Sequence, residues 1–107
     1  MLLLYDREDS FNEMSPEDMQ NEIGEHMKWI EKLGDHYDSG EALLQNAKTI
    51  KGKSKIVTDG PYIESKELMG GFYIIKADSL EEAAELAKNC PTLELGGSVE
   101  VREVMEM

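Results

Sequence analysis

Two residues of this chain are candidates for acid–base chemistry: a histidine in a helical segment and an aspartate in a turn. His26 follows Ile23 by three positions and precedes Ile30 by four, so it falls on or beside the apolar stripe of a predicted helix. Burying an imidazole is costly unless it is hydrogen-bonded. His26 is therefore either satisfied by a backbone carbonyl or water at the edge of the stripe, or it acts as a proton shuttle near neutral pH.

The aspartate, Asp59, opens the sequence Asp59-Gly60-Pro61, which is typical of a turn. Aspartate side chains bond the backbone two residues on, glycine tolerates positive φ, and proline disfavours helix at the residue before it. On this interpretation Asp59 simply ends a hairpin. A turn does not demand aspartate over asparagine, so a need for its charge stays open.

Other patterns predict less chemistry. The two histidines and the many carboxylates show no metal-ligand spacing, so we expect no metal and no cofactor. Gly70-Gly71 lacks the features of a phosphate loop and instead predicts a bulge, or a close backbone approach, at the start of a central strand. Cys90, just before Pro91, is expected to be a small apolar filler.

Composition and charge limit the function classes. The 107 residues are 40% hydrophobic and 32% charged, which predicts one folded domain over 1–107 with a modest core. A net charge of -12 argues against binding to nucleic acid or to anionic membranes. No apolar run approaches the roughly 20 residues that cross a bilayer, and Leu2 to Leu4 is too short for a signal peptide. A single cysteine allows no internal disulfide, so we expect a cytoplasmic protein.

The apolar periodicity predicts seven elements. They are a strand at 1–5, a helix starting at Ser15-Pro16 and ending at Leu33, a short strand at 38–44, a hairpin within 48–59, a strand at 69–77, a helix starting at Ser79 and ending at Cys90-Pro91, and a strand at 98–105. The first helix carries a predicted inward stripe formed by Met19, Ile23, Met27, Ile30 and Leu33.

This order predicts an α+β, ferredoxin-like split βαβ fold with an inserted β-hairpin and an antiparallel sheet. Both helices then cover one face of the sheet. In the strand at 69–77, however, Phe72 and Ile74 point one way while Tyr73, Ile75 and Ala77 point the other. We therefore expect a homodimer packed sheet to sheet, the alternative being an exposed face with a few tolerated aromatics.

The stretch VTDGPYIESKELMGGFYIIKADSLEEAAELAKNCP resembles the diagnostic segment of the YCII-related, or DGPF, family. HMKWIEKLGDHYDSGEAL resembles the segment upstream, and VEVRE resembles the closing strand, so the resemblance covers nearly the whole chain. Two departures are Tyr62 where phenylalanine is usual and Glu103 where proline is usual. The resemblance implies a subunit that pairs into a dimeric α/β barrel.

The resemblance also implies a small enzyme with a His-Asp pair, which carries over to His26 and Asp59. Such a pair could transfer protons in the isomerisation, elimination or hydrolysis of an unknown small organic acid or ring. The alternatives are a non-catalytic metabolite-binding or regulatory module, linked to transcription because some family genes lie near sigma factors, and a structural dimer without ligand. Four side chains are candidates for substrate binding: Tyr5, Tyr62, Tyr73 and Arg102.

Overall fold

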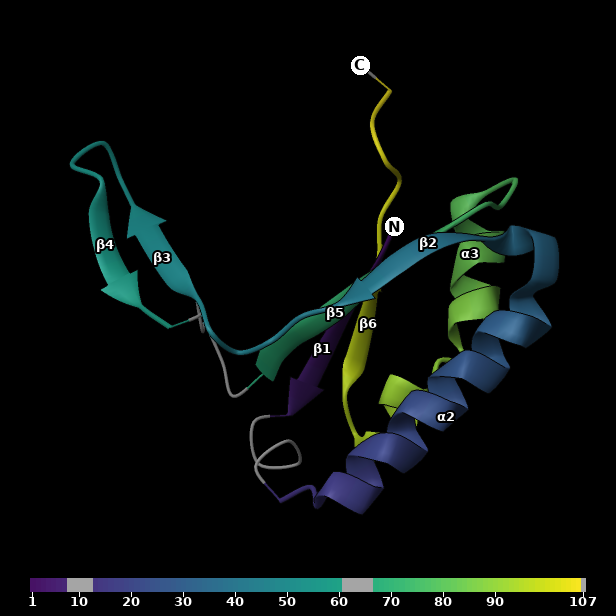
Figure 1. Ribbon diagram of the computed structural model, residues 1–107. Coiled ribbons are helices and arrows are strands. Elements are labelled where there is room, and N and C mark those ends of the chain that lie inside the picture. Colours follow the sequence, from purple (N-terminus) through teal and green to yellow (C-terminus); the bar gives the residue numbers. More distant parts are fainter. Residues whose placement is uncertain (8–12, 61–66, 107) are drawn as a thin grey trace.

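The computed structural model describes residues 1–7, 13–60 and 67–106. Its strands and helices, with two short 3-10 turns (η), follow the predicted order (Figure 1). They are β1 (Leu2–Arg7), α2 (Pro16–Leu33), η1 (Gly34–His36), β2 (Tyr37–Ala42), β3 (Lys48–Lys51), β4 (Ile56–Asp59), β5 (Glu67–Ile75), α3 (Leu80–Ala87), η2 (Pro91–Leu95) and β6 (Ser98–Val101).

Four of these strands form one antiparallel sheet in the order β2-β5-β1-β6, and β3 and β4 form a separate hairpin. Both helices lie on the same face of the four-stranded sheet, whereas the hairpin extends away from it (Figure 1). The α+β, ferredoxin-like fold with an inserted hairpin is therefore confirmed. The prediction for the last strand was too long. It ends at Val101, and Arg102, just beyond the strand, exchanges backbone hydrogen bonds with Met1.

Both predicted helix starts are confirmed by their caps. The backbone N–H of Asp18 donates to the Ser15 hydroxyl at 3.1 Å, and the Ser15 N–H donates to the Asp18 carboxylate at 3.3 Å. In α3 the Glu82 N–H donates to the Ser79 hydroxyl at 3.1 Å. These bonds satisfy N–H groups that a helix end would otherwise leave unpaired. They set where each helix begins and hence which side chains of α2 face the sheet.

The core lies between the sheet and the C-terminal part of α2. Its buried members are Leu2, Leu4, Trp29, Leu33, Tyr73, Ala87 and Cys90. The predicted inward stripe of α2 was partly wrong, because Met19, Ile23 and Met27 are 39%, 53% and 63% exposed. Packing of Trp29 and Leu33 holds the end of α2 on the sheet, while the earlier turns border an open hollow. Three residues expected in the core therefore line a cavity.

The central strands β1 and β5 are apolar on both faces, as predicted. Leu2, Leu4 and Tyr73 point into the core, whereas Leu3 pairs with Phe72 on the opposite, outer face. Leu3 and Phe72 are only half-buried in the single chain, because neither of the helices α2 and α3 covers this outer face (Figure 1). An apolar surface of this kind favours contact with another polypeptide.

Gly70 forms the predicted irregularity at the start of the central strand. Leu4 pairs with Gly71 and Tyr5 pairs with Met69, so Gly70 is an extra residue in the β5 ladder. A side chain at Gly70 would occupy the space taken by the Asp6 carboxylate. The bulge therefore makes room for an acidic group on the inner face of the sheet.

Gly40 gives a direct test of this close packing. A Cβ at Gly40 would lie 2.8 Å from the Phe72 carbonyl oxygen and against the Tyr73 ring, whereas a Cβ at Gly24, on α2, would meet nothing within 4 Å. We expect Gly40→Ala to lower the free energy of unfolding by about 1–3 kcal/mol through overpacking. Gly24→Ala, the matched control, should raise it by roughly 0.5–1 kcal/mol. Urea unfolding followed by far-UV circular dichroism measures both, and equal effects would contradict the packing described.

Candidate functional site

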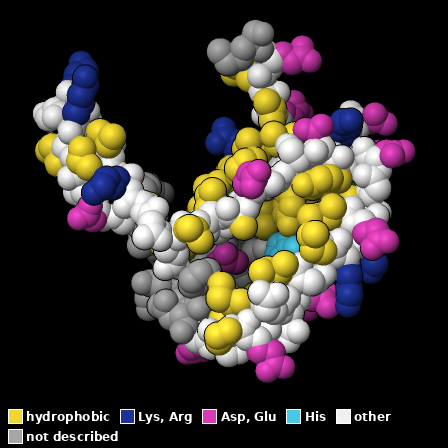
Figure 2. All heavy atoms as spheres, in the orientation of Figure 1, with side chains coloured by type: hydrophobic (Ala, Val, Ile, Leu, Met, Phe, Trp, Pro, Cys, Tyr) yellow, Lys and Arg dark blue, Asp and Glu magenta, His cyan; other side chains and the backbone are white. Residues whose placement is uncertain are grey.

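A cavity of about 360 Å³ lies between α2 and the inner face of the sheet. Figure 2 shows it as a hollow bordered by apolar side chains, with a histidine side chain inside. Met19, Ile23 and Met27 border it from α2, and Leu4 and Tyr73 border it from the sheet. An apolar hollow with a few polar groups at its wall is the usual form of a small-molecule site.

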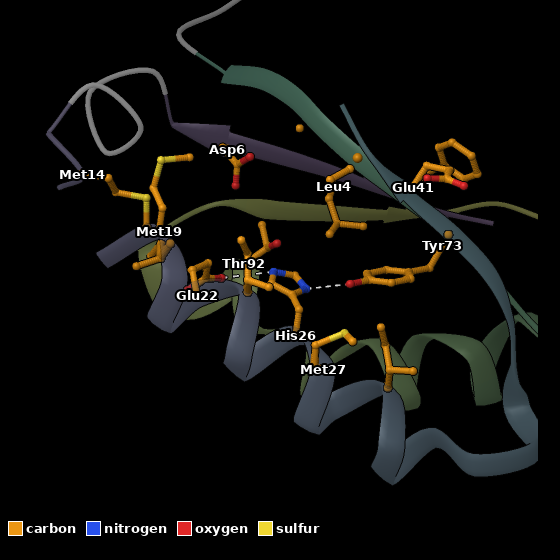
Figure 3. Close-up of a pocket in the computed structure, with 18 of the residues that line it drawn as sticks. Leu4, Asp6, Met14, Met19, Glu22, His26, Met27, Glu41, Tyr73 and Thr92 are labelled. Atoms are coloured by element: carbon orange, nitrogen blue, oxygen red, sulfur yellow. Dashed lines mark hydrogen bonds and ion pairs between the residues drawn. The ribbon is translucent and has the colours of Figure 1, made fainter. Parts of the chain in front are cut away.

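Three polar side chains form a row along the wall of this cavity (Figure 3). The Nδ1 atom of His26 lies 2.7 Å from the Tyr73 hydroxyl, and its Nε2 atom lies 3.1 Å from Glu22 Oε1. Glu22 Oε1 is buried and, among the described residues, has no aligned hydrogen-bond donor despite this short distance. The Asp6 side chain lies on the opposite wall of the cavity, on β1 (Figure 3), and its negative charge acts on Glu22. The row therefore ends in a carboxylate that can still accept a proton or a hydrogen bond.

Local geometry explains why these side chains meet. Glu22 and His26 are four residues apart on α2, so they lie on one face of the helix. Asp6 continues the alternation of Leu2 and Leu4 on the inner face of β1. The Tyr73 ring is held by the edge-on ring of Trp29, with centroids 5.2 Å apart.

Burial controls the protonation of this row. It lowers the pKa of His26, so the imidazole is neutral at pH 7. It raises the pKa of the Tyr73 hydroxyl, so this group stays protonated and donates. The pKa of Glu22 is raised by burial first, and then by the negative charges of Asp6 and Glu25; that of Asp6 is raised by burial. In a consistent neutral arrangement, Tyr73 donates to Nδ1 and the proton on Nε2 faces Glu22.

A family model for the YCII-related domain matches residues 1–107. The chain belongs to the YCII-related family. An uncharacterised protein of Rhizobium meliloti (strain 1021) is 46% identical over 48 residues, which are 44% of this chain and 39% of that relative. A structure of 5-chloro-2-hydroxyhydroquinone dehydrochlorinase from Burkholderia phenoliruptrix, in complex with 2,5-dihydroxybenzoquinone, aligns over 96% of this chain and 94% of that one, with 23% identity and a TM-score of 0.41.

Of the side chains singled out from the sequence of this YCII-related protein, His26 and Tyr73 lie together in the cavity. Asp59 does not meet His26 within one chain: it lies on the extended hairpin, 89% exposed, and accepts a hydrogen bond from Lys48 at 2.7 Å. Neither Tyr5 nor Arg102 is among the described residues that line the cavity. Tyr5 shares the outer face of the sheet with Met69, and Arg102 is exposed beyond β6. Tyr62 lies outside the described residues.

Two carboxyl groups of the site were missed in the sequence. Glu22 precedes His26 by four residues, a spacing that places a carboxylate beside an imidazole on any helix. Asp6 is the acidic residue at the end of an apolar strand, on the face of Leu2 and Leu4. Both the spacing of Glu22 and the position of Asp6 can be read in the YCII-related sequence. Each pattern is also common where no site exists, because acidic residues occur on solvated helix faces and at strand ends.

Metal and membrane features are limited in the described parts of the YCII-related chain. Over residues 1–7, 13–60 and 67–106, no group of three or more His, Cys, Asp and Glu side chains is arranged to hold a metal ion. In the same ranges, no helix is both long enough and apolar enough to span a bilayer.

The Glu22 carboxylate provides a pH-dependent test. Its pKa is raised in the folded state, so the fold disfavours its ionised form, and this cost appears as the pH rises from the ordinary value of 4.5 through the raised pKa. We expect Glu22→Gln to be more stable than the wild type at pH 7, and this advantage should shrink as the pH falls and Glu22 becomes protonated. Urea unfolding at a series of pH values measures the difference. Glu25→Gln, altering an exposed carboxylate on the same helix, is the control, and an equal or larger gain in that variant would contradict the prediction.

Proposed function

We propose that this protein binds a small organic molecule in the α2–sheet cavity and transfers a proton to or from it. The observation that carries the proposal is the row formed by Glu22, His26 and Tyr73 at the wall of an apolar cavity. A neutral imidazole between a hydroxyl donor and a carboxylate is suited to general base catalysis near neutral pH. The chemistry requires no cofactor.

The proton can move through Tyr73. A carbon or oxygen acid bound beside its hydroxyl gives its proton to the hydroxyl oxygen, while the proton of that hydroxyl passes to Nδ1 of His26, which lies 2.7 Å from the oxygen. Tyr73 never becomes a free phenolate, in agreement with its raised pKa. The imidazolium that forms faces Glu22, whose negative charge stabilises it. Return of the proton to another carbon of the same molecule completes an isomerisation. Delivery of the proton to a leaving group, as the bond between carbon and that group breaks, completes an elimination.

The charges around the cavity favour a neutral or cationic ligand. Asp6 and Glu22 both line it, and Arg102, the predicted anchor for an anion, does not. Arg7 also lines the cavity, and its side chain lies against Gly96. These two carboxyl groups, that of Glu41, which also lines the cavity, and the net charge of -12 oppose an organic anion. A compound with an apolar ring and a hydroxyl or amine donor could instead satisfy the buried oxygen of Glu22.

The homodimer is part of this proposal. The apolar outer face formed by Leu3, Phe72 and their neighbours supports packing against the same face of a second copy. The pairing of His26 with Asp59 stays a prediction, since Glu22 is the carboxylate beside His26 within one chain.

A non-catalytic binding module is the second candidate function. It is favoured by one observation: the Nδ1 atom of His26 already has the Tyr73 hydroxyl as its hydrogen-bond partner and Nε2 lies beside Glu22, as expected for a structural histidine. In that case the cavity binds a metabolite without changing it, and a regulatory role linked to transcription stays a prediction.

A screen in D₂O separates the two functions without knowledge of the product. Small hydroxylated rings and cyclic amines are incubated with the protein, and NMR detects binding by shifts at Tyr73 and turnover by exchange of ligand C–H for deuterium. Catalysis predicts deuterium incorporation that requires the protein, and a binding module predicts shifts alone. Ligands that shift only residues outside the cavity would overturn the proposal.

Titrating His26 in Glu22→Gln and Asp59→Asn then identifies its carboxylate partner, since removing that partner lowers the pKa of His26.

A further inference from the structure

The hairpin arm, residues 48–59, carries apolar side chains that nothing covers in the single chain. Ile50, Ile56 and Val57 are 66%, 62% and 54% exposed, and all four residues of β4 are exposed. Figures 1 and 2 show the arm extending from the body, with apolar and basic side chains along it. An isolated two-stranded ribbon is only marginally stable in water, so exposed aliphatic groups on such a ribbon indicate a docking surface.

The charge of the arm is opposite to that of the body. The arm holds four lysines, Lys48, Lys51, Lys53 and Lys55, and one acidic residue, Asp59, for a formal charge of +3. The whole chain carries -12, so the remaining residues carry -15. A basic, aliphatic arm is thus attached to a strongly acidic body, and opposite potentials favour association of such surfaces.

A surface of matching character lies along α2. An acidic depression borders the cavity there, lined by Glu13, Met14, Asp18, Asn21, Glu22, Glu25 and Leu95. Met19, Ile23 and Met27, which border the neighbouring cavity, supply exposed apolar area for the aliphatic side chains of the arm. Within one chain the arm and α2 lie far apart (Figure 1). The two surfaces can therefore meet only between molecules.

We infer that the hairpin arm of one copy docks on the acidic α2 surface of a second copy of this chain. Each copy carries both surfaces, so two copies can exchange their arms symmetrically. This goes beyond a dimer formed by the sheets, because the arm covers the open side of the other copy's cavity. It also offers a route by which Asp59 of one copy approaches His26 of the other.

Paramagnetic labelling tests the exchange directly. Ser54, at the tip of the arm, is changed to cysteine and given a nitroxide; Cys90 is buried and should not react. This nitroxide-bearing chain, which contains no ¹⁵N, is mixed with ¹⁵N-labelled wild type. Broadening of the wild-type signals then reports only contacts between copies. We expect broadening of amide signals in the N-terminal half of α2. A nitroxide at Lys88→Cys, directly after α3, is the control and should not broaden them.

Charge reversal gives the second measurement. Lys53→Glu with Lys55→Glu should abolish the broadening and raise the dimer dissociation constant in low salt by roughly tenfold. Lys76→Glu with Lys88→Glu, which changes the net charge equally outside the arm, should leave the broadening in place. Three outcomes would each overturn the inference. They are no broadening when the arm lysines are intact, a monomeric mass at tens of micromolar, and broadening that survives reversal of the arm lysines.

Discussion

Replacing His26 by glutamine is expected to slow deuterium exchange of a bound carbon acid by about 10²–10⁴-fold, the usual contribution of a general base. The side chain of His26 is 18% exposed and touches Tyr73 at 2.7 Å. Glutamine can keep one hydrogen bond at this place, but it cannot carry the proton. Binding of the compound should therefore change far less than the rate of exchange.

His36 provides the matched control for this prediction. It is the second histidine of the chain, its Nδ1 atom lies 2.7 Å from the Lys76 carbonyl oxygen, and it is not among the described residues that line the cavity. His36→Gln should retain the rate of the wild type. A His26→Gln variant that is folded, binds the compound and exchanges deuterium at the wild-type rate would show that His26 is not the base, and the binding module would become the better interpretation.

Replacing Trp29 by alanine is expected to lower the free energy of unfolding by about 3–5 kcal/mol. Trp29 is 4% exposed and joins α2 to the sheet through its edge-on contact with Tyr73. Its removal leaves a cavity that the neighbouring side chains fill only partly. A domain of this size has about 5–15 kcal/mol of stability in total, so the variant should be close to unfolded under warm conditions.

Met27→Ala is the control for Trp29→Ala. Met27 is 63% exposed on the same helix, so its truncation should cost less than about 1 kcal/mol. Because Trp29 is the only tryptophan in the sequence, unfolding in urea is best followed by far-UV circular dichroism rather than fluorescence. A similar loss of unfolding free energy in the two variants would show that the core does not lie around Trp29 and Leu33.

Local signals in the sequence predicted most of the fold. Ser15 and Ser79 carry oxygens that cap the helix N-terminus following them, a property that depends on a few neighbouring residues. Alternation predicted that the central strands are apolar on both faces, and Gly70-Gly71 predicted the bulge. Such features were readable because their causes lie within a few residues along the chain.

The surroundings of His26 were decided by the tertiary structure. The sequence by itself determined a histidine on an inward-facing part of a helix, but not that bulky Trp29 packs on the sheet while Met19 and Ile23 border a cavity. Glu22 meets the imidazole through a local spacing of four residues, whereas the contact with the Tyr73 hydroxyl and the separation from Asp59 depend on where the strands and the hairpin lie. Those are contacts between distant segments, and their energies depend on packing in three dimensions rather than on any local pattern.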